Sequence, residues 1–353
     1  MRVKKTILAL FAIAALLFSS FSLFGCEAFG YRKLERTEHR FFDTVCTLVG
    51  YEKSEKEFAA VADKVFTMLE EYHKLYDIRN AYKDINNLYE INKVVNGSHR
   101  KLTVDERIID LILFSKEAYA LSGGATNVAM GSVLSLWSKA REEYEELGSC
   151  NLPSEAALKA AALHTDIEAV EVDRENSTVY ISDPGITLDV GATAKGYATE
   201  MIARELENMG ISGYMLNFGG NVRVVGSKPS GDDWSVGIED PRADSKDPFL
   251  RIIETSSAAV VTSGSYHRYL VYDGKKYHHI IDPDTLYPAQ YYISVSVISD
   301  NSGMADALST ALFTMPIGEA LDLINSIDGA EAMLLDINGE LHFSQGFDSL
   351  TKK

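Results

Sequence analysis

The sequence predicts an α+β protein with antiparallel sheets, because helical and strand-like hydrophobic periods occur in separate stretches of the chain. Residues 54–76 carry apolar side chains at helical spacing. Residues 293–299 instead alternate Ile and Val with Ser, as expected of a strand buried on one face. Short strand-like segments follow one another in groups between residues 214 and 299. This grouping favours a mixed architecture over a doubly wound sheet, in which strands and helices alternate.

The first 25 residues have the pattern of an export signal. Positive charges at Arg2, Lys4 and Lys5 precede an uncharged apolar run over residues 6–24. The run closes on Leu-Phe-Gly-Cys, which resembles a bacterial lipobox. This resemblance implies cleavage before Cys26, lipidation of Cys26, and a chain anchored to the cell membrane on its extracytoplasmic side. The alternative is a permanent membrane anchor, since the run approaches the roughly 20 residues that span a bilayer.

The body of the chain is acidic and rich in apolar residues. The 353 residues include 34 Lys and Arg against 51 Asp and Glu, which gives a net charge of −17, and 46% of the residues are hydrophobic. This composition supports a sizeable core and argues against nucleic acid as a partner, because a nucleic-acid groove needs clustered basic residues. We expect a tether over residues 26–36, one domain over residues 37–347 and a tail over residues 348–353.

The cysteine content does not indicate a zinc site, since the sequence has three cysteines and no CxxC pair. Besides Cys26, Cys46 and Cys150 could form a disulfide in an extracytoplasmic compartment. Two free thiols fit the sequence equally well.

Two capping boxes predict where the first helices of the body begin. Ser54 with Glu57 opens a helix over residues 54–76, and Thr103 with Glu106 opens a helix that ends at residues 122–124. The segments around these helices are a strand over residues 41–51, an irregular Asn-rich stretch over residues 80–97, and strands over residues 168–173 and 177–182.

Most of the expected strands lie in the second half of the chain. Gly219-Gly220 and Asn338-Gly339 favour tight hairpin turns. Helices are expected over residues 193–209, 304–314 and 317–325, and the first of them should end at Gly210. The strands are expected over residues 214–216, 222–225, 234–238, 258–261, 269–272, 277–281 and 293–299.

Residues 189–197, with the sequence DVGATAKGY, could bind a phosphate group. Asp189 ends an extended segment, a glycine-containing turn follows, and Lys195 lies in the first turns of a helix. The free N–H groups of a helix N-terminus favour an anion, and a nearby ammonium group adds positive charge. By itself the segment is also compatible with an ordinary turn between a strand and a helix.

Two further groups of residues could bind a metal or a phosphate. His278 and His279 lie beside an Asp-Pro turn, although such a pair also occurs at ordinary strand ends. Asp306 and Thr310 are four residues apart, so on a helix their oxygens project from one face. Such oxygens suit a hard cation, but Asp306 could also cap the start of its own helix. GxSxG, Walker and GxGxxG patterns are absent from the sequence.

Together, these segments resemble the ApbE family of FAD:protein FMN transferases. The family patterns are D-x-G-x-x-A-K-G-Y, N-x-G-G-N, T-S-G-x-Y-x-R, H-I-I-D-P and A-D-A-x-S-T. They are matched, in this order, by residues 189–197, 217–221, 262–268, 279–283 and 305–310. The resemblance extends more weakly to residues 42–44 and 123–127. It implies an ApbE-like, T-fold-related mixed α/β sandwich over residues 37–347.

The resemblance also implies one site that holds FAD as substrate and Mg²⁺ as cofactor. The residues expected to contact FAD are Phe42, Tyr82, Ala125, Thr126, Asn127, Asp189, Lys195 and His279. The metal ligands expected are the carbonyl of Ala192 and the side chains of Asp306 and Thr310. Two positions depart from the family pattern: Leu286 stands where glycine is common, and Asn127 where aspartate is usual.

The implied reaction is transfer of FMN from FAD to a Thr or Ser hydroxyl of an exported redox protein, with release of AMP. His279 and Asp306 are the candidates for the catalytic base that deprotonates the acceptor hydroxyl. Acceptors of the family carry a D-x-x-T-x-[AS]-[TS]-like stretch. Two alternatives remain: an FAD pyrophosphatase that gives FMN and AMP, and a non-catalytic FAD-binding lipoprotein.

Overall fold

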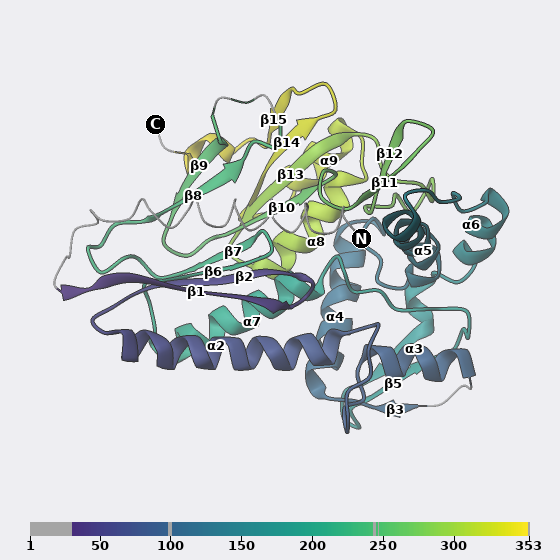
Figure 1. The fold of residues 1–353 in the computed structure, drawn as a ribbon, viewed down its shortest axis with the longest axis horizontal. Coiled ribbons are helices and arrows are strands. Elements are labelled where there is room, and N and C mark those ends of the chain that lie inside the picture. The colour runs from purple at the N-terminus through teal and green to yellow at the C-terminus, as the bar shows by residue number, and fades with distance from the viewer. Residues whose placement is uncertain (1–29, 98–100, 243–244, 246, 352–353) are drawn as a thin grey trace.

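An eight-stranded antiparallel sheet forms the centre of the fold (Figure 1). The computed structural model describes residues 30–97, 101–242, 245 and 247–351. In sheet order the strands are β1 (Arg32–Phe41), β2 (Thr44–Glu52), β6 (Tyr214–Phe218), β7 (Asn221–Val225), β10 (Ala259–Gly264), β13 (Tyr292–Ser299), β14 (Ala330–Asp336) and β15 (Leu341–Phe343). The predicted α+β class with antiparallel sheets is confirmed.

The two faces of this sheet are covered by different elements. One face packs on the helices α2 (Glu55–Tyr76), α7 (Ala194–Asn208), α8 (Ser302–Phe313) and α9 (Ile317–Asn325). The other face packs on the two-stranded ribbon of β8 (Trp234–Glu239) and β9 (Phe249–Thr255) and on the 3₁₀ helix η3 (Phe347–Leu350). Strand β2 shows the alternation, because Leu48 joins the helix side and Val49 the ribbon side.

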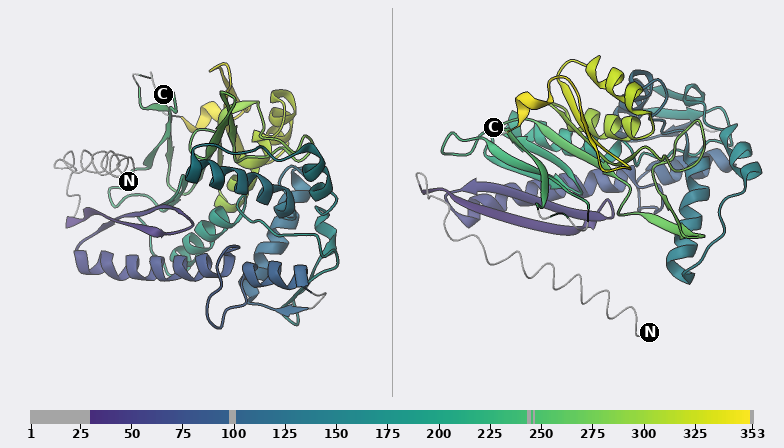
Figure 2. Two further views of the ribbon diagram at one scale, coloured as in Figure 1. Left: turned by 45° about the vertical axis from the view of Figure 1, so that its right-hand side comes forward. Right: turned by 90° about the horizontal axis from the view of Figure 1, so that it is seen from above.

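A second group of elements lies at one end of the long axis (Figures 1 and 2). It consists of α3 (Leu88–Gly97), α4 (Glu106–Leu121), α5 (Gly131–Leu147), α6 (Glu155–Ala162), η2 (Ile167–Ala169), the sheet of β3 (Leu102–Thr103), β5 (Thr178–Ile181) and β4 (Val170–Asp173), and the hairpin of β11 (Tyr269–Tyr272) and β12 (Lys275–His278). Ala194 and Ala198 of α7 pack into the core beneath α4. Helix α7 therefore packs against both groups of elements, through Ala194 and Ala198 on one side and Ile202 and Leu206 on the other.

Many of the local signals were interpreted correctly. Ser54 Oγ accepts the Glu57 N–H at 3.2 Å at the start of α2. Gly210 follows the end of α7 with a φ of 70°, and Gly219-Gly220 forms the turn between β6 and β7 with φ values of 60° and 87°. Cys46 and Cys150 are both free thiols.

The expectations for the two ends of the domain were wrong. Residues 32–36, expected in the tether, belong to β1, which pairs with β2 from Arg32 onward. Strand β1 is an edge strand with mostly polar and exposed side chains, so it lacks the hydrophobic alternation that reveals an inner strand. In the expected tail, residues 348–350 belong to η3, and Thr351 bridges Ile253.

Two helix starts were also predicted incorrectly. Helix α3 lies in the Asn-rich stretch expected to be irregular, and Asn87 Oδ1 accepts the Glu90 N–H at 3.2 Å at its start. Asp105, not Thr103, caps α4, since its carboxylate accepts the Arg107 N–H at 3.0 Å. Thr103 lies in β3 instead. Strand β9 and the helices α5 and α6 were not anticipated.

Residues 1–29, which include the expected signal peptide over residues 1–25 and Cys26, lie outside the described residues. Within the described part of the chain, no helix is both long and apolar enough to span a bilayer.

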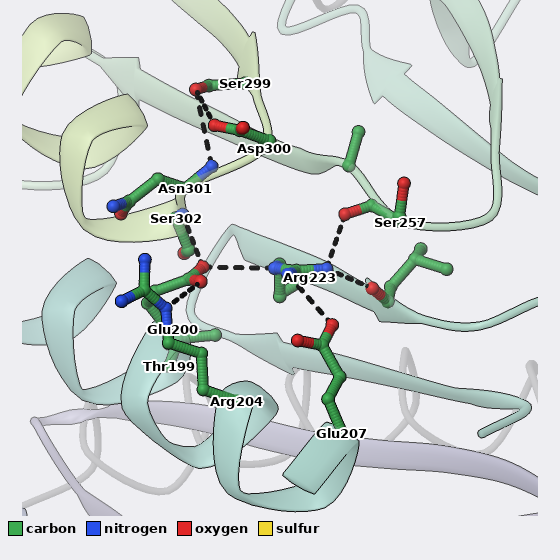
Figure 3. A network of polar contacts seen from close by, with 12 residues as sticks. Thr199, Glu200, Arg204, Glu207, Arg223, Ser257, Ser299, Asp300, Asn301 and Ser302 are labelled. Atoms are coloured by element: carbon green, nitrogen blue, oxygen red, sulfur yellow. Dashed lines mark hydrogen bonds and ion pairs between the residues drawn. The ribbon is translucent and has the colours of Figure 1, made fainter. Parts of the chain in front are cut away.

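A buried network of charges joins α7 to β7 and to the first residue of α8 (Figure 3). Glu200 and Arg223 are 2% and 4% exposed, and Arg223 Nε donates to Glu200 Oε2 at 3.0 Å. The same oxygen accepts the Ser302 N–H at 2.8 Å. Arg223 also donates to Glu207 at 3.0 Å and to the carbonyls of Val224 and Ser257. One carboxylate thus fixes three elements against one another.

Replacing Arg223 by leucine should lower the free energy of unfolding by about 3 kcal/mol, because Glu200 would remain buried without its main partner. Urea denaturation followed by circular dichroism measures this loss. Arg204→Leu is the matched control: Arg204 also pairs with Glu200, at 2.9 Å, but its side chain is 53% exposed. The control should cost about 1 kcal/mol or less, and equal losses for the two variants would contradict the role of the buried pair.

Candidate functional site

The segment before α7 forms a turn that begins at Asp189. Asp189 Oδ1 accepts the Gly191 N–H at 2.9 Å, and the Val190 carbonyl accepts the Ala194 N–H at 2.8 Å, which starts the helix. Burial raises the pKa of Asp189, while the bond from Gly191 and the charges of Arg79 and Arg141 oppose this rise. The predicted turn and helix start are confirmed, and Lys195 lies in the first turn of α7.

Asp306 of α8 caps this helix from outside. Its Oδ2 atom accepts the Gly196 N–H at 2.8 Å, and its Oδ1 atom lies 3.6 Å from Lys195 Nζ. Thr193, at the N-cap position of α7, makes no side-chain capping bond. Helix α8 is capped by Asn301, whose Oδ1 accepts the Met304 N–H at 3.1 Å. Asp306 therefore caps α7, whereas the alternative considered from the sequence was that it caps the start of its own helix, α8.

The two helices can meet at this point because residue 196 is a glycine. A Cβ atom at Gly196 would lie 2.4 Å from the Cβ of Asp306 and 2.5 Å from the carbonyl oxygen of Ser302. Both distances are shorter than real Cβ contacts allow. Only glycine lets the backbone of α7 touch α8 closely enough for the bond to Asp306.

Lys195 also contacts Asn221, which follows the Gly219-Gly220 turn. Lys195 Nζ donates to Asn221 Oδ1, and Asn221 is fully buried. Burial lowers the pKa of Lys195, whereas Asp306 raises it and the charge of Arg268 lowers it further. The sequence interpretation treated residues 217–221 as a hairpin turn. It missed Asn221 as a site residue, although this asparagine ends the matched N-x-G-G-N pattern.

Basic side chains gather beside Asp189 and Lys195. Arg141 Nη1 and His279 Nδ1 are buried atoms that have no hydrogen-bond partner within the described part of the chain. Burial lowers the pKa of Arg141, and the charges of Arg268 and Arg79 add to this effect, while Asp189 opposes it. Burial and the charges of Arg141 and Arg268 lower the pKa of His279 to about 3. Such a cluster in a chain of net charge −17 fits an anionic ligand, because an anion would offset the mutual repulsion.

Sequence reasoning missed Arg79 and Arg141, which belong to no recognisable motif. Arg268 is the last residue of the matched T-S-G-x-Y-x-R pattern but was given no role. His278, the neighbour of His279, is buried and bonded inside the protein. Its Nε2 atom lies 2.6 Å from the carbonyl oxygen of Ala289, and its Nδ1 accepts the Ile280 N–H at 3.2 Å. The two histidines therefore have different roles.

The predicted FAD-lining residues 125–127 lie next to α8. Thr126 is 1% exposed and its Oγ1 donates to the Ala307 carbonyl at 2.7 Å. Asn127 accepts the Ala129 N–H at 2.9 Å and donates to the Thr165 carbonyl at 2.8 Å. Both polar side chains thus hold the loop in place, and Ala125 is half-buried beside them. Their contact with FAD stays a prediction.

Phe42 and Tyr82 lie together on another side of the site. Phe42 and Asp43 form the turn between β1 and β2, and Arg268 Nη2 donates to the Asp43 carbonyl at 3.2 Å. Tyr82 Oη donates to Asp77 Oδ2 at 2.8 Å. Burial and this bond raise the pKa of Tyr82 to about 12. Arg268 thus connects the Phe42 turn with the basic cluster.

The residues predicted as metal ligands fit a hard cation by their chemistry. Asp306 is 5% exposed, and Thr310 lies one turn further along α8 with a half-buried side chain. Ala192 lies two residues before the start of α7, whose first turn Asp306 caps. A carboxylate, a hydroxyl and a carbonyl oxygen form an all-oxygen set that suits Mg²⁺.

The buried basic groups beside an all-oxygen set of possible metal ligands suit a phosphate-bearing ligand, and comparison with known proteins identifies the class as a family of transferases. The chain belongs to the ApbE family, whose sequence model matches residues 42–334. It is 31% identical over 322 residues to the FAD:protein FMN transferase of Treponema pallidum (strain Nichols), which covers 86% of this chain and 84% of that protein. It is 29% identical over 286 residues to an FAD:protein FMN transferase of Klebsiella pneumoniae (strain 342), with 81% and 85% covered.

The solved structures agree with the sequence comparisons. The crystal structure of the ApbE protein of Thermotoga maritima matches this fold with a TM-score of 0.77 at 27% identity, over 92% of this chain and 100% of that one. The resemblance seen in the five sequence patterns is confirmed.

We expect Gly196→Ala to lower the free energy of unfolding by about 1–3 kcal/mol, because the added methyl group forces α7 and α8 apart. Gly318→Ala is the matched control. Gly318 also lies in the first turn of a helix, but nothing lies within 4 Å of its Cβ position. Thermal denaturation of both variants makes the comparison, and a Gly196→Ala protein as stable as the control would refute the close approach.

The low pKa of His279 makes the stability of the ligand-free protein depend on pH. In the unfolded chain a histidine titrates near pH 6.5, whereas His279 in the fold titrates at about 3. Between these values the unfolded state binds a proton that the folded state does not, so stability falls as the pH falls below about 6.5.

Replacing His279 by the always neutral glutamine should remove this contribution. The difference in unfolding free energy between wild type and His279→Gln should be constant above pH 7.5. At pH 5.5 the wild type should have lost about 1 kcal/mol of unfolding free energy relative to His279→Gln. Urea denaturation across this range makes the test, and parallel pH profiles would show that His279 is not held neutral.

Proposed function

We propose that the protein is an FAD:protein FMN transferase that moves FMN from FAD to a Thr or Ser hydroxyl of an acceptor protein and releases AMP. The observation that carries this proposal is the junction of α7 and α8. There Asp306 meets Gly196 and Lys195, beside one nitrogen of Arg141 and one of His279 that have no hydrogen-bond partner among the described residues. The names of the relatives from Treponema and Klebsiella support the choice of substrate.

The basic cluster suits the pyrophosphate of FAD. Lys195, Arg141 and Arg268 supply positive charge, and Arg141 Nη1 has a free N–H to donate. Burial lowers the pKa values of Lys195 and Arg141, which shows that their positive charges are not fully offset by negative groups. A bound anion would offset these charges and reduce their mutual repulsion. Binding of FAD at this cluster would also bring its phosphates close to the first turn of α7.

Asp306, Thr310 and the Ala192 carbonyl would hold the Mg²⁺ ion. A bound Mg²⁺ would neutralise the negative charge that develops on the leaving phosphate. Asp306 keeps its orientation through the Gly196 N–H, and its Oδ1 atom, 3.6 Å from Lys195 Nζ, would remain available to a metal ion. The close contact at Gly196 therefore determines the position of the metal ligand.

His279 is the better candidate for the base that accepts the proton of the acceptor hydroxyl. Among the residues that the structure describes, its Nδ1 has no hydrogen-bond partner, and its lowered pKa keeps the imidazole neutral in the ligand-free protein. The phosphates of bound FAD would offset the charges of Arg141 and Arg268 and raise this pKa toward the range that suits a base. Asp306 already accepts a hydrogen bond from Gly196 and faces Lys195. We assign the proton transfer to His279 and the electrostatic role to Asp306.

The location of the enzyme follows from the N-terminal sequence. The signal pattern over residues 1–25 and the lipobox-like Cys26 support a lipid anchor and an extracytoplasmic position. The acceptor is then an exported redox protein with a flavinylation-type Thr or Ser motif. The acidic net charge of the chain is consistent with a protein rather than a nucleic-acid partner.

The test incubates the purified protein with FAD, Mg²⁺ and an acceptor domain that bears a D-x-x-T-x-[AS]-[TS] stretch. Intact mass spectrometry should detect the addition of one FMN to the acceptor. Asp306→Asn should slow labelling about 100-fold or more, because it removes the charge that binds the metal. Asp300→Asn, the same change at an exposed position just before α8, should leave the rate unchanged.

Other outcomes identify the alternatives. Release of FMN and AMP without labelling would favour an FAD pyrophosphatase. FAD that stays bound and intact, with Mg²⁺ and with EDTA alike, would indicate a flavin carrier.

A further inference from the structure

One histidine of α2 joins the two aromatic residues that are expected to contact FAD. His73 is half-buried, and its Nδ1 atom lies 3.3 Å from the backbone nitrogen of Phe42. Its Nε2 atom lies 3.3 Å from Tyr82 Oη. The ring also contacts the rings of Phe42 and Tyr82 edge-on, at centroid distances of 5.6 and 6.3 Å. No sequence pattern singled out His73.

The hydrogen bonds define the tautomer of this histidine. The N–H of Phe42 can only donate, so His73 Nδ1 must accept and carries no proton. In the neutral ring the proton is then on Nε2, which donates to Tyr82 Oη. The hydroxyl of Tyr82 in turn donates to Asp77 Oδ2 at 2.8 Å. Each donor in this chain of hydrogen bonds meets an acceptor.

The chain of hydrogen bonds ends on a carboxylate that organises the neighbouring loop. Asp77 accepts the backbone N–H groups of Arg79 and Asn80 at 2.7 and 3.0 Å, and the side-chain amide of Asn80 at 3.0 Å. The same loop carries the Arg79 side chain, whose charge acts on Asp189 and Arg141. His73 is therefore joined, through Tyr82 and Asp77, to the loop that carries Arg79.

At its other end the chain of hydrogen bonds holds a strained turn. Phe42 and Asp43 have φ values of 52° and 51°, a region that residues other than glycine seldom adopt. His73 accepts the N–H at Phe42, and Arg268 donates to the carbonyl of Asp43 at 3.2 Å. Two-residue hairpin turns favour such φ values, but usually with Asn, Asp or Gly at the first position. A phenylalanine there is strained, and the strain persists only where surrounding contacts enforce it.

We propose that His73, as its Nε2–H tautomer, is a positioning residue that holds the Phe42 and Tyr82 rings in place to contact the isoalloxazine ring of FAD. This inference rests on the proposed function, which supplies the flavin. The reaction breaks the pyrophosphate bond, which is remote from the isoalloxazine. Contacts to that ring are therefore equal in the bound substrate and in the transition state. Losing them should raise KM and leave kcat unchanged.

The kinetic test uses the whole protein with FAD and an acceptor domain. His73→Leu should raise KM for FAD and the Kd measured by flavin fluorescence about tenfold, as expected for the loss of two neutral hydrogen bonds. The kcat should stay within about twofold of wild type. His73→Asn, whose amide oxygen can replace Nδ1 as acceptor, should recover part of the affinity. His39→Leu, at an exposed position on β1, is the matched control and should change nothing.

A second comparison isolates the bond to Tyr82. Tyr82→Phe should raise KM in the wild-type protein, and it should raise KM by a smaller factor in His73→Asn, where only the bond from Tyr82 to Asp77 remains to be lost. An unchanged KM in His73→Leu would overturn the proposal. So would a fall in kcat at constant KM, because that pattern reports a smaller folded fraction.

The tautomer can be tested without any activity. Nitrogen NMR of the ¹⁵N-histidine-labelled protein should show His73 with an unprotonated Nδ1 and a protonated Nε2. A proton on Nδ1 would overturn the proposed chain of hydrogen bonds. If the wild-type protein does not bind FAD, the proposed function fails on that measurement alone. If wild type binds FAD and the His73 variants match it, only the role of His73 is overturned.

Discussion

The carboxylate of Glu200 is the interaction on which the arrangement of the site depends. It lies on α7 one turn after Gly196, and it accepts the first N–H of α8, one turn before Asp306. Arg223 holds the same carboxylate against the central sheet. Burying these charges is costly, and the cost is offset only because each group has several partners. The network therefore contributes a defined geometry more than net stability, and the geometry it defines is the contact between Gly196 and Asp306.

The positive charges of the site are arranged in a way that favours ligand binding and opposes folding. A chain with 51 acidic and 34 basic residues places Lys195, Arg141, Arg268 and Arg79 where their charges act on one another. Without a ligand this arrangement opposes folding, because burial and repulsion disfavour the charged forms. An anionic ligand converts the same charges into binding energy and stabilises the folded protein. A local conflict of this kind is typical of binding sites rather than of structural cores.

The sequence predicted the elements that carry the site better than the contacts between them. Ser54, Gly210 and the two hairpin turns were predicted correctly, because capping and turn formation depend on a few neighbouring residues. Asp306 was assigned to one helix face, but its bond to Gly196 crosses 110 positions and leaves no periodic signal. Arg141 and His73 were missed for the same reason. Strand β1 and helix α3 escaped notice because polar edge residues and asparagines conceal hydrophobic periodicity.

The site is held from two directions, and Arg268 is the residue common to both. On the phosphate side, Glu200 and Gly196 position Asp306 and Lys195, and the charge of Arg268 acts on Lys195 and His279. On the aromatic side, His73 positions Phe42 and Tyr82, and Arg268 bonds the Asp43 carbonyl in the same turn. FAD carries its negative charge on the pyrophosphate and its isoalloxazine and adenine rings at a distance from it, so a protein that binds FAD through its charge and one ring needs both supports at a fixed spacing. Arg268 contacts both supports. A substitution at this exposed residue should therefore have a non-additive effect on FAD affinity when it is combined with a substitution at Glu200 or at His73. Substitutions at Glu200 and His73 should have additive effects on FAD affinity.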